Sequence, residues 1–168
     1  FQSVLEKFNL KEGEFILITM HRPATVDHKE GLEQLLDLLS RLTEKHQVVF
    51  PMHPRTLNNI SKYGLQKAFE ALKHITITGP LDYFSFQNLI HNCKMVLTDS
   101  GGIQEESTFK LKPCLTLRPN TERPSTITEG SNVLLDFDIE NILNYVEAVE
   151  SGSFKKSKVP KFWDGKAT

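Results

Sequence analysis

The sequence predicts an α/β fold in which a mostly parallel, six-stranded sheet is doubly wound in the Rossmann-like manner. Short apolar runs of strand length alternate along the chain with longer segments whose apolar residues follow helical spacing. The runs are nearly continuous, which is typical of parallel strands that are covered on both faces. We therefore expect strands at residues 15–19, 48–50, 75–78, 95–97, 114–117 and 132–135.

Helical segments connect these strands. The segment 29–46 carries leucines at helical spacing along one face, which predicts an amphipathic helix. Asp82 precedes another periodic segment and can cap its first turn, whereas Gly13 and Gly64 interrupt the pattern. We expect helices at 1–10, 29–46, 56–63 and 66–72, between Asp82 and Cys93, after Gly102, and at 139–149.

The size and composition fit one domain with a buried core. Of the 168 residues, 39% are hydrophobic. We assign residues 1–150 to this domain and residues 151–168, which are basic and interrupted by Pro and Gly, to a C-terminal tail. The formal net charge of −1 provides no electrostatic footprint for nucleic acid, and no apolar run reaches the length of a membrane span. We expect neither a nucleic acid nor a membrane as partner.

The two cysteines do not form a CxxC motif or a disulfide framework. Cys93 ends a predicted helix and Cys114 begins a predicted strand, so both are interpreted as small core residues. A reducing cytoplasm is the expected setting. Because the chain begins at Phe1 without a methionine, we expect a fragment of a longer protein.

Polar loops follow the predicted strands. Ligands of doubly wound sheets bind at the carboxyl ends of the strands. We therefore expect these loops to converge on one rim of the sheet. They contain His21-Arg22, His53-Pro54-Arg55, Ser100-Gly101-Gly102 and Glu122-Arg123.

The turn at Asp99-Ser100-Gly101-Gly102 joins an apolar run to a predicted helix. Asp99 or Ser100 can cap that helix, and its unpaired N–H groups favour an anion, so the turn is a candidate phosphate site. The alternative is a tight turn with a capping serine and no ligand. The turn lacks GxGxxG and the P-loop pattern, which disfavours a nicotinamide cofactor and ATP hydrolysis.

Five further side chains are candidates for ligand contacts. Glu105 or Glu106 could accept hydrogen bonds from ribose hydroxyls, or could only complement the helix dipole. Arg123 could bind phosphate or remain a solvated loop residue. His21 could contact phosphate or transfer a proton, and His53 is weighed in the same way; both could instead be structural. No cluster has metal-ligand spacing, so no metal ion is expected.

Taken together, the motifs resemble those of the non-hydrolysing UDP-N-acetylglucosamine 2-epimerases. Their order and spacing match over nearly the whole chain, and the string Thr-Asp-Ser-Gly-Gly-Ile-Gln-Glu-Glu is long and specific. The matching blocks are Ile-Thr-Met-His-Arg at 18–22, Pro-Met-His-Pro at 51–54, Gly-Pro-Leu at 79–81, the string at 98–106, Thr-Glu-Arg-Pro at 121–124 and Phe-Trp-Asp-Gly-Lys-Ala at 162–167.

The resemblance implies a GT-B fold, in which a UDP-sugar binds between two Rossmann-like halves. This chain matches only the C-terminal half, and the tail at 151–168 would lead back towards the missing N-terminal domain. The implied reaction converts UDP-GlcNAc to UDP-ManNAc by elimination of UDP and re-addition to the resulting glycal, without NAD or another cofactor. A cytoplasmic homodimer that serves cell-surface polysaccharide biosynthesis is the implied setting.

The resemblance also implies roles for individual residues. Ser100 and Arg123 would bind the UDP phosphates beside Gly101 and Gly102, and Glu106 would bind the ribose. His21 matches a catalytic histidine near the diphosphate and the reacting centre. Separately, His53 resembles a histidine that, in some bacterial members, contacts a second UDP-GlcNAc that acts as an allosteric activator.

The chain departs from the family pattern in two ways. Residues 23–27 are Pro-Ala-Thr-Val-Asp, where many members have x-Glu-Asn after His-Arg, and this bears on the substrate, because related enzymes epimerise UDP-sugars with extra amino or carboxylate groups. The family's other catalytic carboxylates belong to the first half, so we expect the fragment alone to be inactive. The alternatives are a GT-B glycosyltransferase domain, a hydrolysing epimerase and a non-catalytic nucleotide-binding module.

Overall fold

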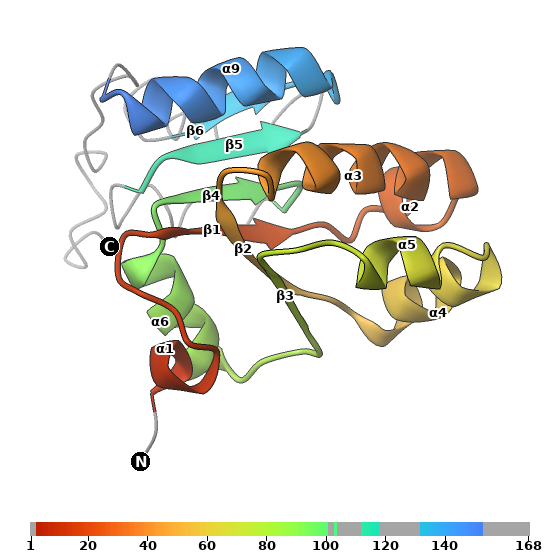
Figure 1. Ribbon diagram of the computed structural model, residues 1–168, viewed down its shortest axis with the longest axis horizontal. Coiled ribbons are helices and arrows are strands. Elements are labelled where there is room, and N and C mark those ends of the chain that lie inside the picture. The colour runs from red at the N-terminus through yellow and green to blue at the C-terminus, as the bar shows by residue number, and fades with distance from the viewer. Residues whose placement is uncertain (1–2, 101–102, 104–111, 118–131, 153–168) are drawn as a thin grey trace, which may run out of the picture.

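The computed structural model describes residues 3–100, 103, 112–117 and 132–152 (Figure 1). The helix predicted after Gly102 and the tail beyond residue 152 lie outside the described residues. Among the described residues, no helix has the length and apolar character needed to cross a membrane.

In chain order the elements are α1 (Val4–Lys7), β1 (Phe15–Thr19), α2 (Pro23–Val26), α3 (Lys29–Leu42), β2 (Gln47–Pro51), α4 (Pro54–Lys62), α5 (Gln66–Glu70), β3 (Ile75–Thr78), α6 (Tyr83–Asn92), β4 (Met95–Thr98), β5 (Cys114–Leu117), β6 (Asn132–Leu135) and α9 (Ile139–Glu150).

The strands form one six-stranded sheet in the order β3-β2-β1-β4-β5-β6. All five neighbouring pairs are parallel, which confirms the predicted parallel, Rossmann-like sheet. β1 pairs with β2 on one side and with β4 on the other, so the strand order reverses between β1 and β4. In open α/β sheets the crevice at this reversal, on the carboxyl edge, is where ligands bind.

Helices cover both faces of the sheet, which explains why the strand sequences are continuously apolar. Along β1, Ile16 and Ile18 belong to a core cluster with residues of α3, α4, α5 and α9. Phe15 and Leu17 point to the opposite face and belong to a second cluster with residues of α1 and α6. All five residues of β1 are buried. Figure 1 shows α3 and α9 on one side of the strands and α1 and α6 on the other.

Three predicted helices are shorter than the sequence indicated, among them α5, which ends at Glu70 instead of residue 72. The first was expected over residues 1–10, but α1 ends at Lys7, and Asn9 adopts the left-handed conformation (φ 54°), which stops a helix. The second was expected to reach residue 46, but α3 ends at Leu42. There the Thr43 hydroxyl donates a hydrogen bond of 2.8 Å to the Leu39 carbonyl oxygen. The apolar pattern also ends at Leu42, because residues 43–46 are Thr-Glu-Lys-His, so the extension to residue 46 had no core-facing residue behind it.

The cap predicted for α6 is confirmed, because the Asp82 carboxylate accepts a hydrogen bond of 2.8 Å from the Ser85 N–H. The predicted core positions of the cysteines are also confirmed. Cys93 and Cys114 are buried and form no disulfide within the described residues. Burial raises the pKa of the Cys93 thiol to about 12, so this side chain remains protonated and unreactive.

The short helix α2 was missed, since the sequence analysis treated the residues after Met20 as a loop. Pro23 occupies its first turn, where the fixed φ of proline suits a helix start. Packing against α3 fixes its position. Gly31 of α3 lies so close that a Cβ atom there would be 2.3 Å from the carbonyl oxygen of Thr25 and 2.8 Å from that of Ala24. The position of α2 therefore depends on a glycine in the neighbouring helix.

We predict that Gly31→Ala lowers the free energy of unfolding by about 1–3 kcal/mol, because the backbone of α2 must move to admit the methyl group. Denaturant titration would measure the change. Gly79→Ala is the matched control, since no heavy atom lies within 4 Å of a Cβ placed there. Equal free energies of unfolding for the two variants would contradict the prediction, because they would show that α2 shifts without loss of stability.

Candidate functional site

The loops after β1 and β4 start side by side at the carboxyl edge of the sheet. Thr19 pairs with Thr98 at the ends of these strands, and their buried hydroxyl oxygens lie 2.7 Å apart. The Thr98 hydroxyl also accepts a hydrogen bond of 2.9 Å from the Ser100 N–H. His21 and Ser100, which are 79 positions apart, therefore lie on loops that leave adjacent strands. For these two loops, the predicted convergence is confirmed.

Asp99 joins the two loops. Its residue is only 2% exposed, and both carboxylate oxygens lie 3.2 Å from the backbone nitrogen of His21, which donates to them. The Arg22 N–H donates to Oδ2 at 3.0 Å. From the sequence, Asp99 is predicted only as a possible cap of the following helix. In the structure its carboxylate instead binds the backbone of the loop after β1, and this interaction across two strands carries no local sequence signal.

The side chain of His21 lies beside the same carboxylate. Its Nδ1 atom is 3.4 Å from Oδ1 of Asp99, while 59% of the side chain is exposed. The buried carboxylate thus contacts one edge of the ring, and much of the ring faces the surface of the rim. This is a suitable placement for a histidine that meets a ligand.

His53 follows β2, which is the neighbour of β1, so it lies along the same edge of the sheet. Its Nδ1 atom accepts a hydrogen bond of 3.1 Å from the Arg55 N–H and so caps α4. The residue is exposed. The structure therefore gives His53 a structural role, and its role towards a ligand stays a prediction.

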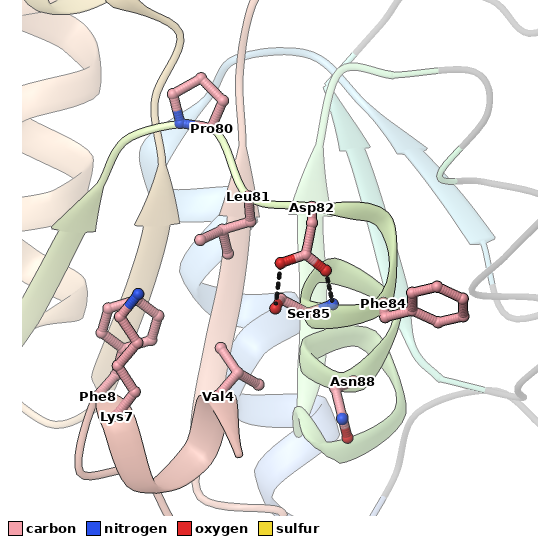
Figure 2. Close-up of a pocket in the computed structure, with 9 residues that line it drawn as sticks. All are labelled: Val4, Lys7, Phe8, Pro80, Leu81, Asp82, Phe84, Ser85 and Asn88. Atoms are coloured by element: carbon pink, nitrogen blue, oxygen red, sulfur yellow. Dashed lines mark hydrogen bonds between the residues drawn. The ribbon is translucent and has the colours of Figure 1, made fainter. Parts of the chain in front are cut away.

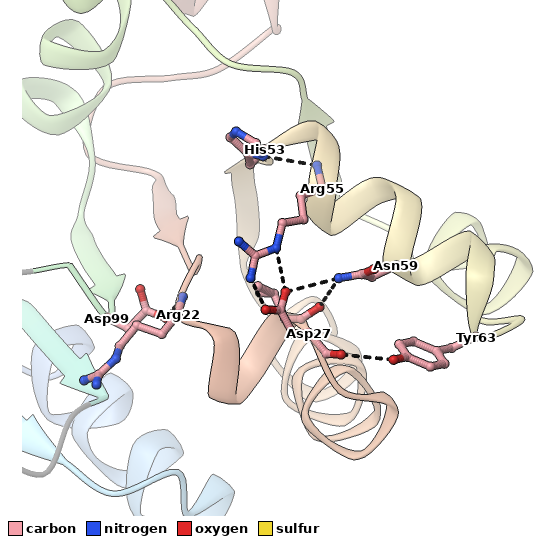
Figure 3. Close-up of polar contacts among 8 residues, drawn as sticks. Arg22, Asp27, His53, Arg55, Asn59, Tyr63 and Asp99 are labelled. Atoms are coloured by element: carbon pink, nitrogen blue, oxygen red, sulfur yellow. Dashed lines mark hydrogen bonds and ion pairs between the residues drawn. The ribbon is translucent and has the colours of Figure 1, made fainter.

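A polar cluster connects α2 to α4, as Figure 3 shows. The guanidinium of Arg55 binds the Asp27 carboxylate through two nitrogens, with Nε 2.8 Å from Oδ1 and Nη2 paired with Oδ2. Asn59 donates to the Val26 carbonyl oxygen at 2.9 Å. The Tyr63 hydroxyl donates to the Asp27 carbonyl oxygen at 3.0 Å. The cluster holds the end of α2 against one face of α4.

The sequence analysis missed this cluster, although one signal for it exists. Arg55, Asn59 and Tyr63 recur every four residues and so share a helix face. Their partner could not be read from the sequence, because Asp27 lies 28 positions before Arg55 and meets it only through the packing of α2.

Several predicted ligand residues lie outside the described residues, namely Gly101, Gly102, Glu106 and Arg123. The predicted convergence of the Arg123 loop on the rim also lies outside the described residues. Of the predicted phosphate site, Ser100 is described, and it is partly buried beside Thr98. Within the described ranges, no three His, Cys, Asp or Glu side chains are grouped in a way that could hold a metal ion.

A pocket of about 510 Å³ lies between α1 and α6 (Figure 2). It is lined by Val4, Lys7, Phe8, Pro80, Leu81, Asp82, Phe84, Ser85 and Asn88. Of the predicted ligand residues that the structure describes, His21, His53 and Ser100, none lines this pocket. Next to it, Tyr83 and Phe84 are 67% and 80% exposed and contact each other edge to face.

The family is shown by comparison with known proteins. A family model described as UDP-N-acetylglucosamine 2-epimerase matches residues 2–168. The chain belongs to this family. The UDP-N-acetylglucosamine 2-epimerase of Methanococcus maripaludis is 40% identical over 139 residues, which are 82% of this chain and 38% of the relative. A UDP-2,3-diacetamido-2,3-dideoxy-D-glucuronate 2-epimerase of Pseudomonas aeruginosa is 36% identical over 72% of this chain and 33% of its own length.

Solved structures support the same assignment. The UDP-GlcNAc 2-epimerase of Methanocaldococcus jannaschii, in complex with UDP-GlcNAc and UDP, is 36% identical with a TM-score of 0.78. The match covers 91% of this chain and 42% of that protein. The chain thus spans about two-fifths of such epimerases and corresponds to their C-terminal half. This confirms the expected fold, the C-terminal domain of a GT-B protein.

We predict that Asp27 and Arg55 are energetically coupled. A double-mutant cycle with Asp27→Ala and Arg55→Ala should give a coupling of about 0.5–1 kcal/mol, since the contact is bidentate but half of the Arg55 side chain is exposed. Unfolding in denaturant at low and high salt measures it, and salt should weaken it. The exposed pair of Arg41 and Glu140 is the control and should show a smaller coupling. No difference between the two pairs would contradict a specific role for Asp27.

Proposed function

We propose that the full-length protein is a UDP-N-acetylglucosamine 2-epimerase, and that this domain supplies the half of the site that holds UDP. The observation that carries the proposal is the contact between two loops at the carboxyl edge, where the strand order reverses between β1 and β4. There, in a chain that belongs to the epimerase family, Asp99 joins the loop that carries His21 to the loop that carries Ser100.

The proposed roles follow from the chemistry of each side chain. Ser100 and the backbone of Gly101 and Gly102 donate hydrogen bonds to the diphosphate, and the guanidinium of Arg123 pairs with its charge. Glu106 accepts hydrogen bonds from the ribose hydroxyls. Of these residues, the placement of Ser100 at the carboxyl edge supports the proposal directly.

The proposed reaction is an elimination followed by an addition. Removal of the C2 proton of the sugar and cleavage of the bond between C1 and the UDP oxygen give a glycal and UDP. Return of a proton to the opposite face of C2 and attack of the UDP oxygen at C1 give the epimer. His21 lies near the diphosphate and the reacting centre, and the N-terminal half supplies the remaining catalytic carboxylates. The domain alone is therefore inactive.

Further proposals concern partners and setting. The N-terminal half of the same chain closes the site, and the exposed pair of Tyr83 and Phe84 offers apolar surface for packing. His53, exposed at the start of α4, contacts a second UDP-GlcNAc as an activator. The full-length protein forms a homodimer in the cytoplasm, where Cys93 and Cys114 stay reduced, and serves cell-surface polysaccharide biosynthesis.

A second candidate substrate is a UDP-sugar with an additional acetamido or carboxylate group. The similarity to the Pseudomonas aeruginosa enzyme favours it, and residues 23–27 are where this chain departs from the common family pattern. The deciding experiment incubates the full-length protein in D₂O with UDP-GlcNAc and with UDP-2,3-diacetamido-2,3-dideoxy-D-glucuronate. Epimer that carries deuterium at C2 is expected from one of them. Irreversible loss of UDP would indicate a hydrolysing epimerase, and UDP release only with an acceptor would indicate a glycosyltransferase.

We predict that Ser100→Ala and Arg123→Ala weaken UDP binding to the full-length protein by about 1.5–3 kcal/mol each, the usual contribution of a hydrogen bond to a charged group. Isothermal titration calorimetry measures the affinity. Ser40→Ala and Arg41→Ala, at exposed positions on α3, are matched controls and should bind UDP normally. Unchanged affinity in both test variants would remove these residues from the phosphate site.

A further inference from the structure

Asp99 is a deeply buried carboxylate of the described part of the rim, and two consecutive backbone N–H groups fix its orientation. The backbone N–H groups of His21 and Arg22 donate to it at 3.0–3.2 Å, and its residue is only 2% exposed. Rotation of the carboxylate would leave these buried contacts unmade, at a cost comparable to the loss of a hydrogen bond. Oδ1 is therefore held in place next to the imidazole of His21.

An ionised carboxylate has only acceptor atoms, so it stabilises a proton on the ring nitrogen that lies next to it. In His21 this nitrogen is Nδ1, which lies 3.4 Å from Oδ1 of Asp99. The distance slightly exceeds an ordinary N–H···O hydrogen bond, as is common for catalytic contacts in ligand-free sites. When the ring is neutral, a proton on Nδ1 leaves Nε2 with a free lone pair on the exposed part of the side chain.

His53 provides a contrast within the same rim. Its Nδ1 atom accepts a hydrogen bond from the Arg55 N–H, so its proton must reside on Nε2 when the ring is neutral. The two histidines that follow neighbouring strands are thus held in opposite tautomers by their local partners.

We propose that Asp99 is a positioning residue that holds His21 with its proton on Nδ1, so that Nε2 is the atom that meets the UDP-sugar and accepts a proton or a hydrogen bond from it. The tautomer rests on the geometry of this domain alone. Only the role of Nε2 towards a UDP-sugar rests on the proposed function.

The direct test is nuclear magnetic resonance of the full-length protein with ¹⁵N-labelled histidine, at a pH where a histidine is neutral. The nitrogen shifts show which ring atom carries the proton, and His21→Gln and His53→Gln assign the signals. We expect the proton on Nδ1 in His21 and on Nε2 in His53. A proton on Nε2 of His21 in the wild-type protein would overturn the proposal without any mutation of Asp99.

Asp99→Asn extends the test. An amide that keeps its oxygen towards the Arg22 N–H presents its NH₂ group to Nδ1 of His21, so the proton of the ring should move to Nε2. We expect kcat to fall about 100-fold, because the reacting atom is misplaced, and KM for the UDP-sugar to change little. Asp138→Asn is the matched control, since asparagine replaces aspartate equally well as the cap of α9.

The possible results separate this inference from the proposed function. A shift of the His21 proton together with the loss of kcat supports the inference, and wild-type kcat in Asp99→Asn contradicts it. If the full-length protein converts no UDP-sugar, the proposed function fails, yet the nitrogen shifts of the wild-type protein still decide which tautomer Asp99 selects. If Asp99→Asn does not fold, the wild-type spectrum remains the decisive measurement.

Discussion

The arrangement of the rim depends on one buried carboxylate. Asp99 sits at the end of β4 with almost no access to water, so its charge must be satisfied by protein donors. The donors that meet it are backbone N–H groups of His21 and Arg22, which lie directly beyond β1. Because β1 and β4 are neighbours at the point where the strand order reverses, this interaction joins the two loops that border the edge at which a doubly wound sheet binds its ligand. Movement of the loop that carries His21 would either expose the Asp99 carboxylate to water or leave it buried without hydrogen-bond donors.

The helix α2 connects the loop that Asp99 holds to the next loop along the rim. It begins beside the Asp99 contact, passes over Gly31 of α3 at a distance that admits no side chain, and ends in the cluster of Asp27, Arg55 and Asn59. Four residues are too few to hold a helix by their own hydrogen bonds. The position of α2 is therefore set by contacts at both of its ends, and these contacts link the loop of His21 to the start of α4, where His53 lies.

The fold was largely predictable, because the apolar pattern within a strand or a helix reflects which of its faces is buried. The continuous apolar run at 15–19 follows from a strand covered on both faces, and the leucines of α3 follow from a helix that buries one face. The lengths of helices were less predictable. The left-handed Asn9 ends a helix that the apolar pattern would continue, whereas α3 ends at Leu42, where its apolar pattern also stops. A four-residue helix such as α2 has no period long enough to detect.

The sequence by itself determined the class of the fold, the edge of the sheet at which polar residues gather, and the family, because these depend on composition, periodicity and motifs that lie within short segments. Only the tertiary structure decided what the polar residues do to one another. The bonds from Asp99 to the backbone of residues 21 and 22, and from Arg55 to Asp27, join segments 77 and 28 positions apart. Their pairing arises from the order of the strands and the packing of the helices, and no local pattern encodes which buried acceptor a distant donor will meet.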